Sequence, residues 1–204
     1  MINYKGDFQS KQDTAISHLP AGAYVGVVVD ASVAVQSIGG RNVERLVLWL
    51  DVAEGEYKGH YGRQYEAAKG GMYAAKYKGV YRITVPQPGD QYESMNKRIM
   101  QGAAWAFEQS NKGYKWDFDE TKLKGLAVGF AVRDVDYLID DVQGVRVMSG
   151  TEICKLESVA DVKAGKVQTP KKRELKEAQK QRLHEYAAEQ MSAQTVETPE
   201  DLPF

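Results

Sequence analysis

The first half of the chain is divided by its apolar pattern into short strand-like segments. Residues 24–35 form a long β-branched run interrupted by glycine, which is typical of a strand with a bend or bulge. Gly39 and Gly40 are a turn signal, and the apolar run 45–52 that follows completes a predicted hairpin. A third strand is expected within residues 59–67.

The apolar spacing then changes from that of strands to that of a helix. Residues 80–85 are predicted to form another short strand, which Pro86 would end. From Ser94 onward, apolar side chains recur every three or four positions, so an amphipathic helix is expected over about 94–110. Trp105 lies on this helix and is expected to be a core residue. The remaining predicted features are a left-handed helix cap at Gly113, a strand at 126–133, a loop at 140–144 and a strand at 145–156.

This order of elements predicts a mainly β fold with helices. Three strands, a helix and two strands are the elements of the OB-fold, a five-stranded antiparallel barrel with its helix between strands three and four. Residues 80–85 would then be an insertion before the helix. Residues 171–190 contain no glycine or proline and interleave Glu with Lys and Arg, which favours an exposed helix in a helical or disordered tail. The predicted divisions are a loosely ordered arm (1–18), the OB-fold domain (19–166), a charged helical spacer (167–196) and an acidic, apolar tip (197–204).

Composition places the chain among folded, non-membrane proteins. An apolar content of 43% supplies a core for a chain of 204 residues. No run of about 18 apolar residues is present, so no membrane span is expected, and the polar N-terminus does not have the pattern of a signal peptide. Cys154 is the only cysteine, which excludes an internal disulfide and suits a reducing cytoplasm.

The distribution of charge is more informative than the net charge of −1. Between Tyr57 and Arg82, six cations stand against one carboxylate, Glu66, and half of the twelve tyrosines lie in the same stretch. Its glycines argue against a helix, and on an extended chain alternate side chains share a face. Single-stranded DNA presents bases for stacking and phosphates for cations, and each stacked base contributes about 1–3 kcal/mol. The pair Gly70 and Gly71 is expected to form a mobile loop that can close over the strand.

These residues predict a surface that binds single-stranded DNA. A second interpretation is that the tyrosines only cover the rim of a small barrel. Trp49 belongs either to the core or to a base-stacking surface, and Arg133 either enters the binding groove or caps its strand in solvent. The candidate DNA-contacting residues are Trp49, Lys58, Tyr61, Arg63, Tyr65, Lys69, Tyr73, Lys76, Tyr77, Lys78, Tyr81, Arg82 and Arg133.

The last eight residues, 197–204, have a composition unsuited to a folded element. Two prolines oppose a helix or central strand, acidic residues favour solvation, and Phe204 combines an aromatic ring with a carboxylate. A frayed terminus is the alternative interpretation. The ending resembles that of bacterial single-stranded DNA-binding proteins, an acidic linker closing in Asp-(Ile/Leu)-Pro-Phe, although only Glu197, Glu200 and Asp201 supply charge here. The resemblance implies recruitment of helicases, primases, nucleases and recombination mediators through Glu200, Asp201, Leu202, Pro203 and Phe204.

A second resemblance concerns the middle of the chain. Residues 108–119 (EQSNKGYKWDFD) and 123–129 (LKGLAVG) resemble phage-encoded OB-fold single-stranded DNA-binding proteins of replication and recombination modules. The likeness extends loosely over 19–166. It implies the same function as the tip, from a different part of the chain, in the cytoplasm of a bacterial host. It does not itself identify DNA-contacting residues.

Motifs for catalysis are not found. No Walker loop, GxGxxG or HExxH occurs, and His18, His60 and His184 are too dispersed, with one cysteine, to predict a zinc set. We therefore expect a non-enzyme without a cofactor or metal, with no membrane partner, that binds single-stranded DNA and acts as a monomer or homo-oligomer. The acidic tip is also expected to compete with DNA for the basic groove. Two rival hypotheses are an OB-fold adaptor that binds protein or RNA, and a metal-dependent nuclease using the pairs Asp117 and Asp119 or Asp140 and Asp141.

Overall fold

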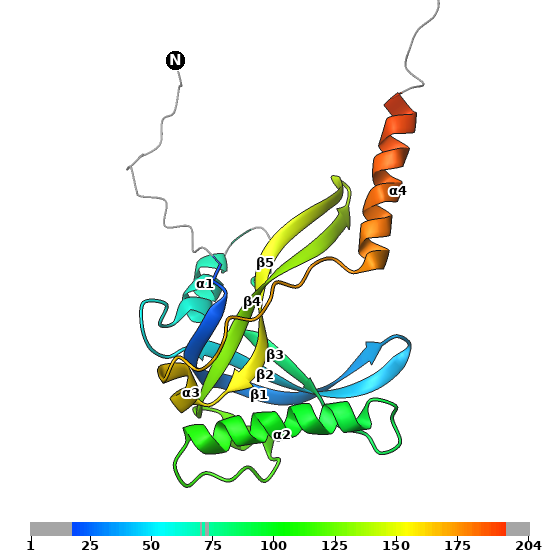
Figure 1. The fold of residues 1–204 in the computed structure, drawn as a ribbon. Helices are drawn as coiled ribbons and strands as arrows, with labels where there is room; N and C mark the ends of the chain where they lie inside the picture. Colours follow the sequence, from blue (N-terminus) through cyan, green and yellow to red (C-terminus); the bar gives the residue numbers. More distant parts are fainter. Residues whose placement is uncertain (1–17, 70, 72–73, 195–204) are drawn as a thin grey trace, which may run out of the picture.

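The protein is built on one five-stranded antiparallel sheet (Figure 1). The computed structural model describes residues 18–69, 71 and 74–194. The strand order is β3-β2-β1-β4-β5. The strands are β1 (Gly22–Ile38), β2 (Arg41–Val52), β3 (Val80–Thr84), β4 (Ala127–Asp141) and β5 (Gly144–Glu157). The helices are α1 (His60–Ala68), α2 (Glu93–Ser110), the 3₁₀ turn η1 (Glu120–Leu123), α3 (Val159–Lys163) and α4 (Glu177–Gln194).

The prediction of a mainly β protein with a helix between the third and fourth strands is confirmed. The first hairpin is present, and Gly39 and Gly40 make its turn with φ of 57° and 77°, a conformation that glycine adopts without strain. The register of β1 against β2 shifts between Val28 and Asp30, where a bend was predicted. The edge strands β3 and β5 approach each other, but no ladder joins them, so the sheet is open.

The third strand is not where the sequence placed it. Residues 59–67 are largely the helix α1, and 80–84 form the third strand rather than an insertion. The cause is Asp51, a buried carboxylate at the end of β2. Its oxygens accept hydrogen bonds from the N–H groups of Tyr61 and Gly62 at 2.9 Å each, in the first turn of α1. A carboxylate at this position satisfies donors that a helix start leaves without partners.

Gly79 lets the chain return from α1 to the sheet. A Cβ at this position would overlap the carbonyl oxygen of Leu50 and the ring of Tyr61. We therefore expect Gly79→Ala to lower the free energy of unfolding by about 1–3 kcal/mol, because the backbone carbonyl of Leu50 cannot move aside for the added methyl group as a flexible side chain could. Urea unfolding followed by circular dichroism measures this change.

Gly102 supplies the matched control for Gly79. It lies in α2, where an added Cβ meets no atom within 4 Å. Gly102→Ala should raise stability by roughly 0.5–1 kcal/mol, because alanine is the better helix former. Equal effects of the two alanines would contradict the close packing at Gly79.

The helix α2 confirms the predicted periodicity, but one of its expected core residues is exposed. Ala106 and Phe107 are fully buried, whereas the Trp105 side chain is 47% exposed. Trp105 is therefore not a core residue, and its expected core position is wrong. The helix ends at Ser110 with Asn111 as its C-cap, and Gly113 has the expected left-handed conformation, φ 76°, two residues beyond that cap. The Asn111 side chain bonds the backbone of Phe107 and of Ala127, which joins the end of α2 to the start of β4.

The second hairpin, β4–β5, is longer than expected. Asp140 and Asp141 belong to β4, and the turn lies at Val142 and Gln143. The hairpin projects from the body of the sheet with α4 beside it (Figure 1), and Arg182 of α4 pairs with Asp140 at 3.0 Å.

The start of the predicted spacer helix is also corrected. Residues 171–176 are not helical, and α4 begins at Glu177. Arg173 pairs with Val135 in a single parallel bridge, and its N–H donates to the carbonyl of Asp134 at 2.9 Å. This backbone pairing competes with helix formation and holds the segment against β4. Residues 1–17 of the predicted arm (1–18) and the predicted tip (197–204) lie outside the described residues.

The core lies between the inner face of the sheet and α2. Its fully buried side chains include Leu46, Leu48 and Leu50 of β2, which alternate with outward-facing residues, together with Phe107 and Phe130. Leu19, the second described residue, is also fully buried. Within the described part of the chain, none of the helices combines the length and apolar character that crossing a membrane requires.

Candidate functional site

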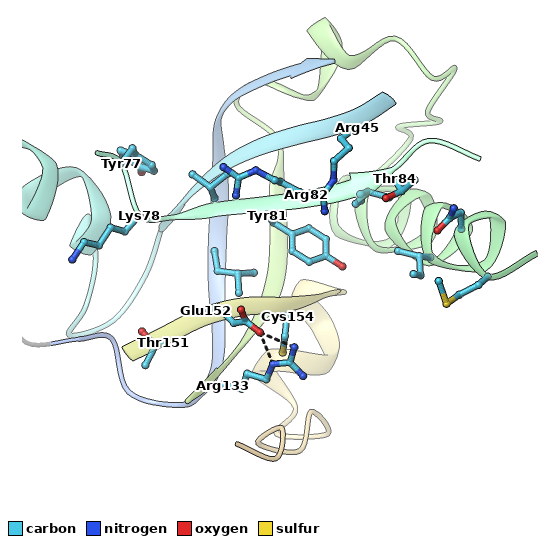
Figure 2. A pocket seen from close by; sticks show the side chains of 16 residues that line it. Arg45, Tyr77, Lys78, Tyr81, Arg82, Thr84, Arg133, Thr151, Glu152 and Cys154 are labelled. Atoms are coloured by element: carbon cyan, nitrogen blue, oxygen red, sulfur yellow. Dashed lines mark hydrogen bonds and ion pairs between the residues drawn. The ribbon is translucent and has the colours of Figure 1, made fainter. Parts of the chain in front are cut away.

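A groove of about 630 Å³ lies between the two edge strands. One wall is β3 with the residues before it, the other is β5, and α2 contributes Met95, Asn96 and Ile99. Lys78 and Thr151 lie toward one end of the groove, and Arg45 and Thr84 toward the other (Figure 2). The groove exists because β3 and β5 are the two edges of the open sheet and are not joined by backbone hydrogen bonds. The space between these two edges is the groove.

Four cations and one carboxylate line this groove. Alternation along β3 directs Ile83 into the core and leaves Arg82 exposed. In the β2–β3 ladder Leu46 pairs with Ile83, and the next pair is Arg45 with Thr84. The pKa of the Arg45 guanidinium is lowered by burial and, to a smaller extent, by repulsion from the positive charge of Arg82. The Nε of Arg45 is buried without a hydrogen-bond partner among the described residues. An anion in the groove would relieve both conditions.

The fourth cation, Arg133, enters the groove and is paired with a carboxylate. Glu152 lies opposite Arg133 in the β4–β5 ladder and accepts its hydrogen bond at 2.8 Å (Figure 2). Arg173 binds the same carboxylate through two nitrogens at 3.0 and 2.8 Å. Burial favours the neutral acid, yet the two arginines together lower the pKa of Glu152. Glu152 therefore remains charged, and because Arg133 and Arg173 share this one carboxylate, the three groups together keep a net charge of +1. The groove cations without a carboxylate partner among the described residues are Arg45, Lys78 and Arg82.

An aromatic hollow lies next to the groove. It has a volume of about 390 Å³, and Trp49, Tyr65 and Tyr77 line it. The rings of Tyr65 and Tyr77 meet edge to face, with centroids 5.9 Å apart, and Tyr77 also lines the groove. The Tyr77 hydroxyl donates to the carbonyl of Leu50 at 3.1 Å, which fixes its ring. Trp49 is half-buried on the outer face of β2, so of its two predicted positions it occupies the one outside the core.

The structure brings together part of the predicted DNA-contacting set. The members that line the groove are Tyr77, Lys78, Tyr81, Arg82 and Arg133. Trp49 and Tyr65 line the aromatic hollow, and the Lys69 ammonium lies 4.7 Å from the centre of the Tyr65 ring. Lys58, Arg63 and Lys76 are exposed but are not among the residues lining either concavity. Tyr73 and the predicted partner-binding residues 200–204 lie outside the described residues.

Tyr61 occupies a different position from the one its spacing indicated. An extended chain would have placed Tyr61, Arg63 and Tyr65 on one face, whereas in α1 the side chain of Tyr61 is only 4% exposed and belongs to the core. It contacts the Tyr77 ring at 6.3 Å between centroids. Tyr61 packs from the core against Tyr77, which lines the aromatic hollow. The expectation that Tyr61 shares an exposed face with Arg63 and Tyr65 is wrong.

Sequence reasoning missed Arg45 and the apolar wall of the groove. Met95 and Ile99 belong to the apolar period that predicted the helix, and in the structure they are 46% and 38% exposed and line the groove. Beyond Ile99 a smaller hollow of about 370 Å³ continues the groove along α2. Cys154 lines both, and burial raises the pKa of its thiol. Arg45 could have been found from the sequence, because residues four apart on a strand lie on the same face, and Arg45 therefore shares a face of β2 with Trp49.

The aspartate pairs considered as metal ligands are engaged in local contacts. Asp117 pairs with Lys122, and Asp119 caps η1 by accepting from the Thr121 N–H at 3.0 Å. Asp141 receives two hydrogen bonds from Arg146, at 2.8 and 3.0 Å, in addition to the Asp140 contact with α4. Across residues 18–69, 71 and 74–194, no group of three or more His, Cys, Asp or Glu side chains is arranged to bind a metal ion.

Comparison with known proteins adds no relative. None of the protein-family models matches the chain, and a search of curated proteins found no match.

Proposed function

We propose that this chain is a sequence-tolerant single-stranded DNA-binding protein with an OB-fold, which recruits DNA-processing proteins through its C-terminal tip. The observation that carries the proposal is the groove, in which three cations have no carboxylate partner within the described part of the chain and aromatic rings lie alongside. An open backbone with exposed bases and phosphates fits such a surface.

The arrangement of the sheet supports the OB-fold interpretation. The five strands are antiparallel, α2 lies between the third and fourth, and the edges β3 and β5 approach each other as the closing strands of a barrel would. OB-folds bind oligonucleotides on the face of strands two and three. In this chain that face carries Arg45 and Trp49 on β2 and Arg82 on β3.

The proposed mechanism separates binding from recruitment. Arg45, Lys78 and Arg82 contact phosphates and release counterions, while Tyr77 and Trp49 stack on bases. The tip, residues 197–204, then binds a helicase, primase, nuclease or recombination mediator. The recruitment part rests on the sequence resemblance of the tip alone, because these residues lie outside the described part of the chain.

The test is a fluorescence titration with oligo(dT) at several salt concentrations. Binding should quench tyrosine and tryptophan emission, because the stacking rings contact bases. The logarithm of the association constant should fall with the logarithm of salt with a slope of about −2, since three phosphate contacts each contribute roughly −0.7 for single strands.

The same titration with oligo(U) of equal length separates the main alternatives. Equal or tighter binding of oligo(U) would replace the DNA assignment by an RNA-binding one. No quenching and no binding at low salt would leave recruitment through the tip as the only function, which is the adaptor hypothesis.

A further inference from the structure

A second, smaller cavity opens beside the groove. It has a volume of about 140 Å³, and α1 faces the β4–β5 hairpin across it. Lys78 and Thr151 line both the cavity and the groove, so the two spaces adjoin at that end of the groove (Figure 2). Val135 and Tyr137 form the wall on the side of β4.

Two polar atoms on the α1 side of this cavity have no hydrogen-bond partner among residues 18–69, 71 and 74–194. They are the Nε2 of His60 and the Oε1 of Gln64, and both are buried. The two residues are one helical turn apart, so their side chains share a face of α1. The His60 residue is 3% exposed, and its ring is held between those of Tyr57 and Tyr61. A buried acceptor left without a partner costs stability, which a suitable ligand would recover.

The chemistry of the two atoms defines what would bind. Burial lowers the pKa of the His60 imidazole, with Arg63 and His18 acting in the same direction and Asp51 opposing them, so the ring is neutral at pH 7. A neutral imidazole donates or accepts one hydrogen bond at Nε2, while the Gln64 oxygen accepts. The complement is a planar edge with an N–H donor beside an acceptor. The Watson–Crick edge of a nucleobase has this arrangement.

The size of the cavity restricts the choice among bases. A cavity of about 150 Å³ in another protein admits one benzene molecule, so 140 Å³ suits a single six-membered ring and not the fused rings of a purine. We propose that this cavity receives one pyrimidine base of a strand bound in the groove. Gln64 and His60 read its Watson–Crick edge, and Lys78 contacts the adjoining phosphate. This inference rests on the proposed function and adds a preference at one position to otherwise sequence-tolerant binding.

The first measurement tests the cavity without the groove. Thymidine monophosphate at millimolar concentration should shift the imidazole NMR signals of His60 in the full chain, and deoxyadenosine monophosphate should not. Gln64→Met keeps the length of the side chain and removes the acceptor, so it should abolish the shift. Gln101→Met on exposed α2 is the matched control and should retain it. Unfolding midpoints of both variants establish that they are folded.

The second measurement uses oligo(dT) and oligo(dA) of equal length. The wild-type chain should prefer oligo(dT), and Gln64→Met should reduce that preference by about fivefold, the effect of one hydrogen bond. Gly150→Ala gives an independent variant from the opposite wall, because its added Cβ would lie 3.3 Å from the Tyr137 ring and narrow the cavity. It should reduce the preference in the same direction.

The outcomes separate this inference from the proposed function. If both oligonucleotides bind but neither variant alters the preference and thymidine monophosphate leaves His60 unshifted, the cavity holds only water and the inference is overturned. If neither oligonucleotide binds, the proposed function fails. In that case the thymidine monophosphate measurement alone shows whether the cavity binds a pyrimidine base.

Discussion

Replacing Lys78 and Arg82 together by alanine should weaken binding of single-stranded DNA about 100-fold at low salt. Each loses a charge-assisted phosphate contact of about 1.5 kcal/mol, and the two losses together correspond to roughly two factors of ten. The salt slope should become shallower by about 1.4, since each contact contributes roughly 0.7. The measurement is the oligo(dT) titration at several salt concentrations.

The protein should remain as stable as the wild type. Both side chains belong to exposed residues, and no carboxylate of the described residues pairs with either. Lys112→Ala with Lys171→Ala is the matched control, because these lysines are exposed, away from the groove, and carry the same charge. If the control pair weakened binding as strongly as the groove pair, the effect would come from net charge, and the groove would not be the binding surface.

The elements that the sequence predicted correctly are those whose signals are local. The first hairpin follows from a β-branched run and a glycine turn, and α2 follows from its apolar period. The start of α1 depends instead on Asp51, which lies ten residues before Tyr61 and acts through space. No pattern within 59–67 reveals that contact, and the glycines there argued for the wrong element.

The candidate site shows the same limit. The cation cluster between residues 57 and 82 was visible as composition, but only strand pairing brings Arg45 beside Arg82 and separates both from Lys58. The apolar period of α2 likewise marked one continuous face. The open edges of the sheet decide that Met95 and Ile99 line the groove while Phe107 fills the core. The spacing of apolar residues predicts which face of a helix is apolar, but it does not predict whether the core or a groove lies against that face.

Asp51→Ala should produce the largest loss of stability of any single substitution considered, about 3 kcal/mol in the free energy of unfolding. The residue is 8% exposed, and its carboxylate accepts three backbone N–H groups, from Val52, Tyr61 and Gly62, at 2.8 to 2.9 Å. Removing it leaves buried donors without a partner, at roughly 1–3 kcal/mol for such a loss. Urea unfolding at constant pH measures the change through the transition midpoint.

Asp30→Ala is the control for Asp51, because Asp30 is exposed and its pairing with Lys124 at 3.6 Å is that of a weak surface ion pair. It should change stability by less than about 0.5 kcal/mol. An effect of Asp51→Ala no larger than this would show that α1 starts without the carboxylate.

The dependence on urea concentration distinguishes local from global loss of structure. If the whole sheet depends on α1, the midpoint falls and the slope stays constant, whereas detachment of α1 alone reduces the slope as well. Detachment would also release the Tyr61 ring from Tyr77 and disturb the aromatic hollow. In that case Asp51→Ala should weaken oligo(dT) binding at urea concentrations where the sheet is still folded, although Asp51 itself lines neither the groove nor the hollow.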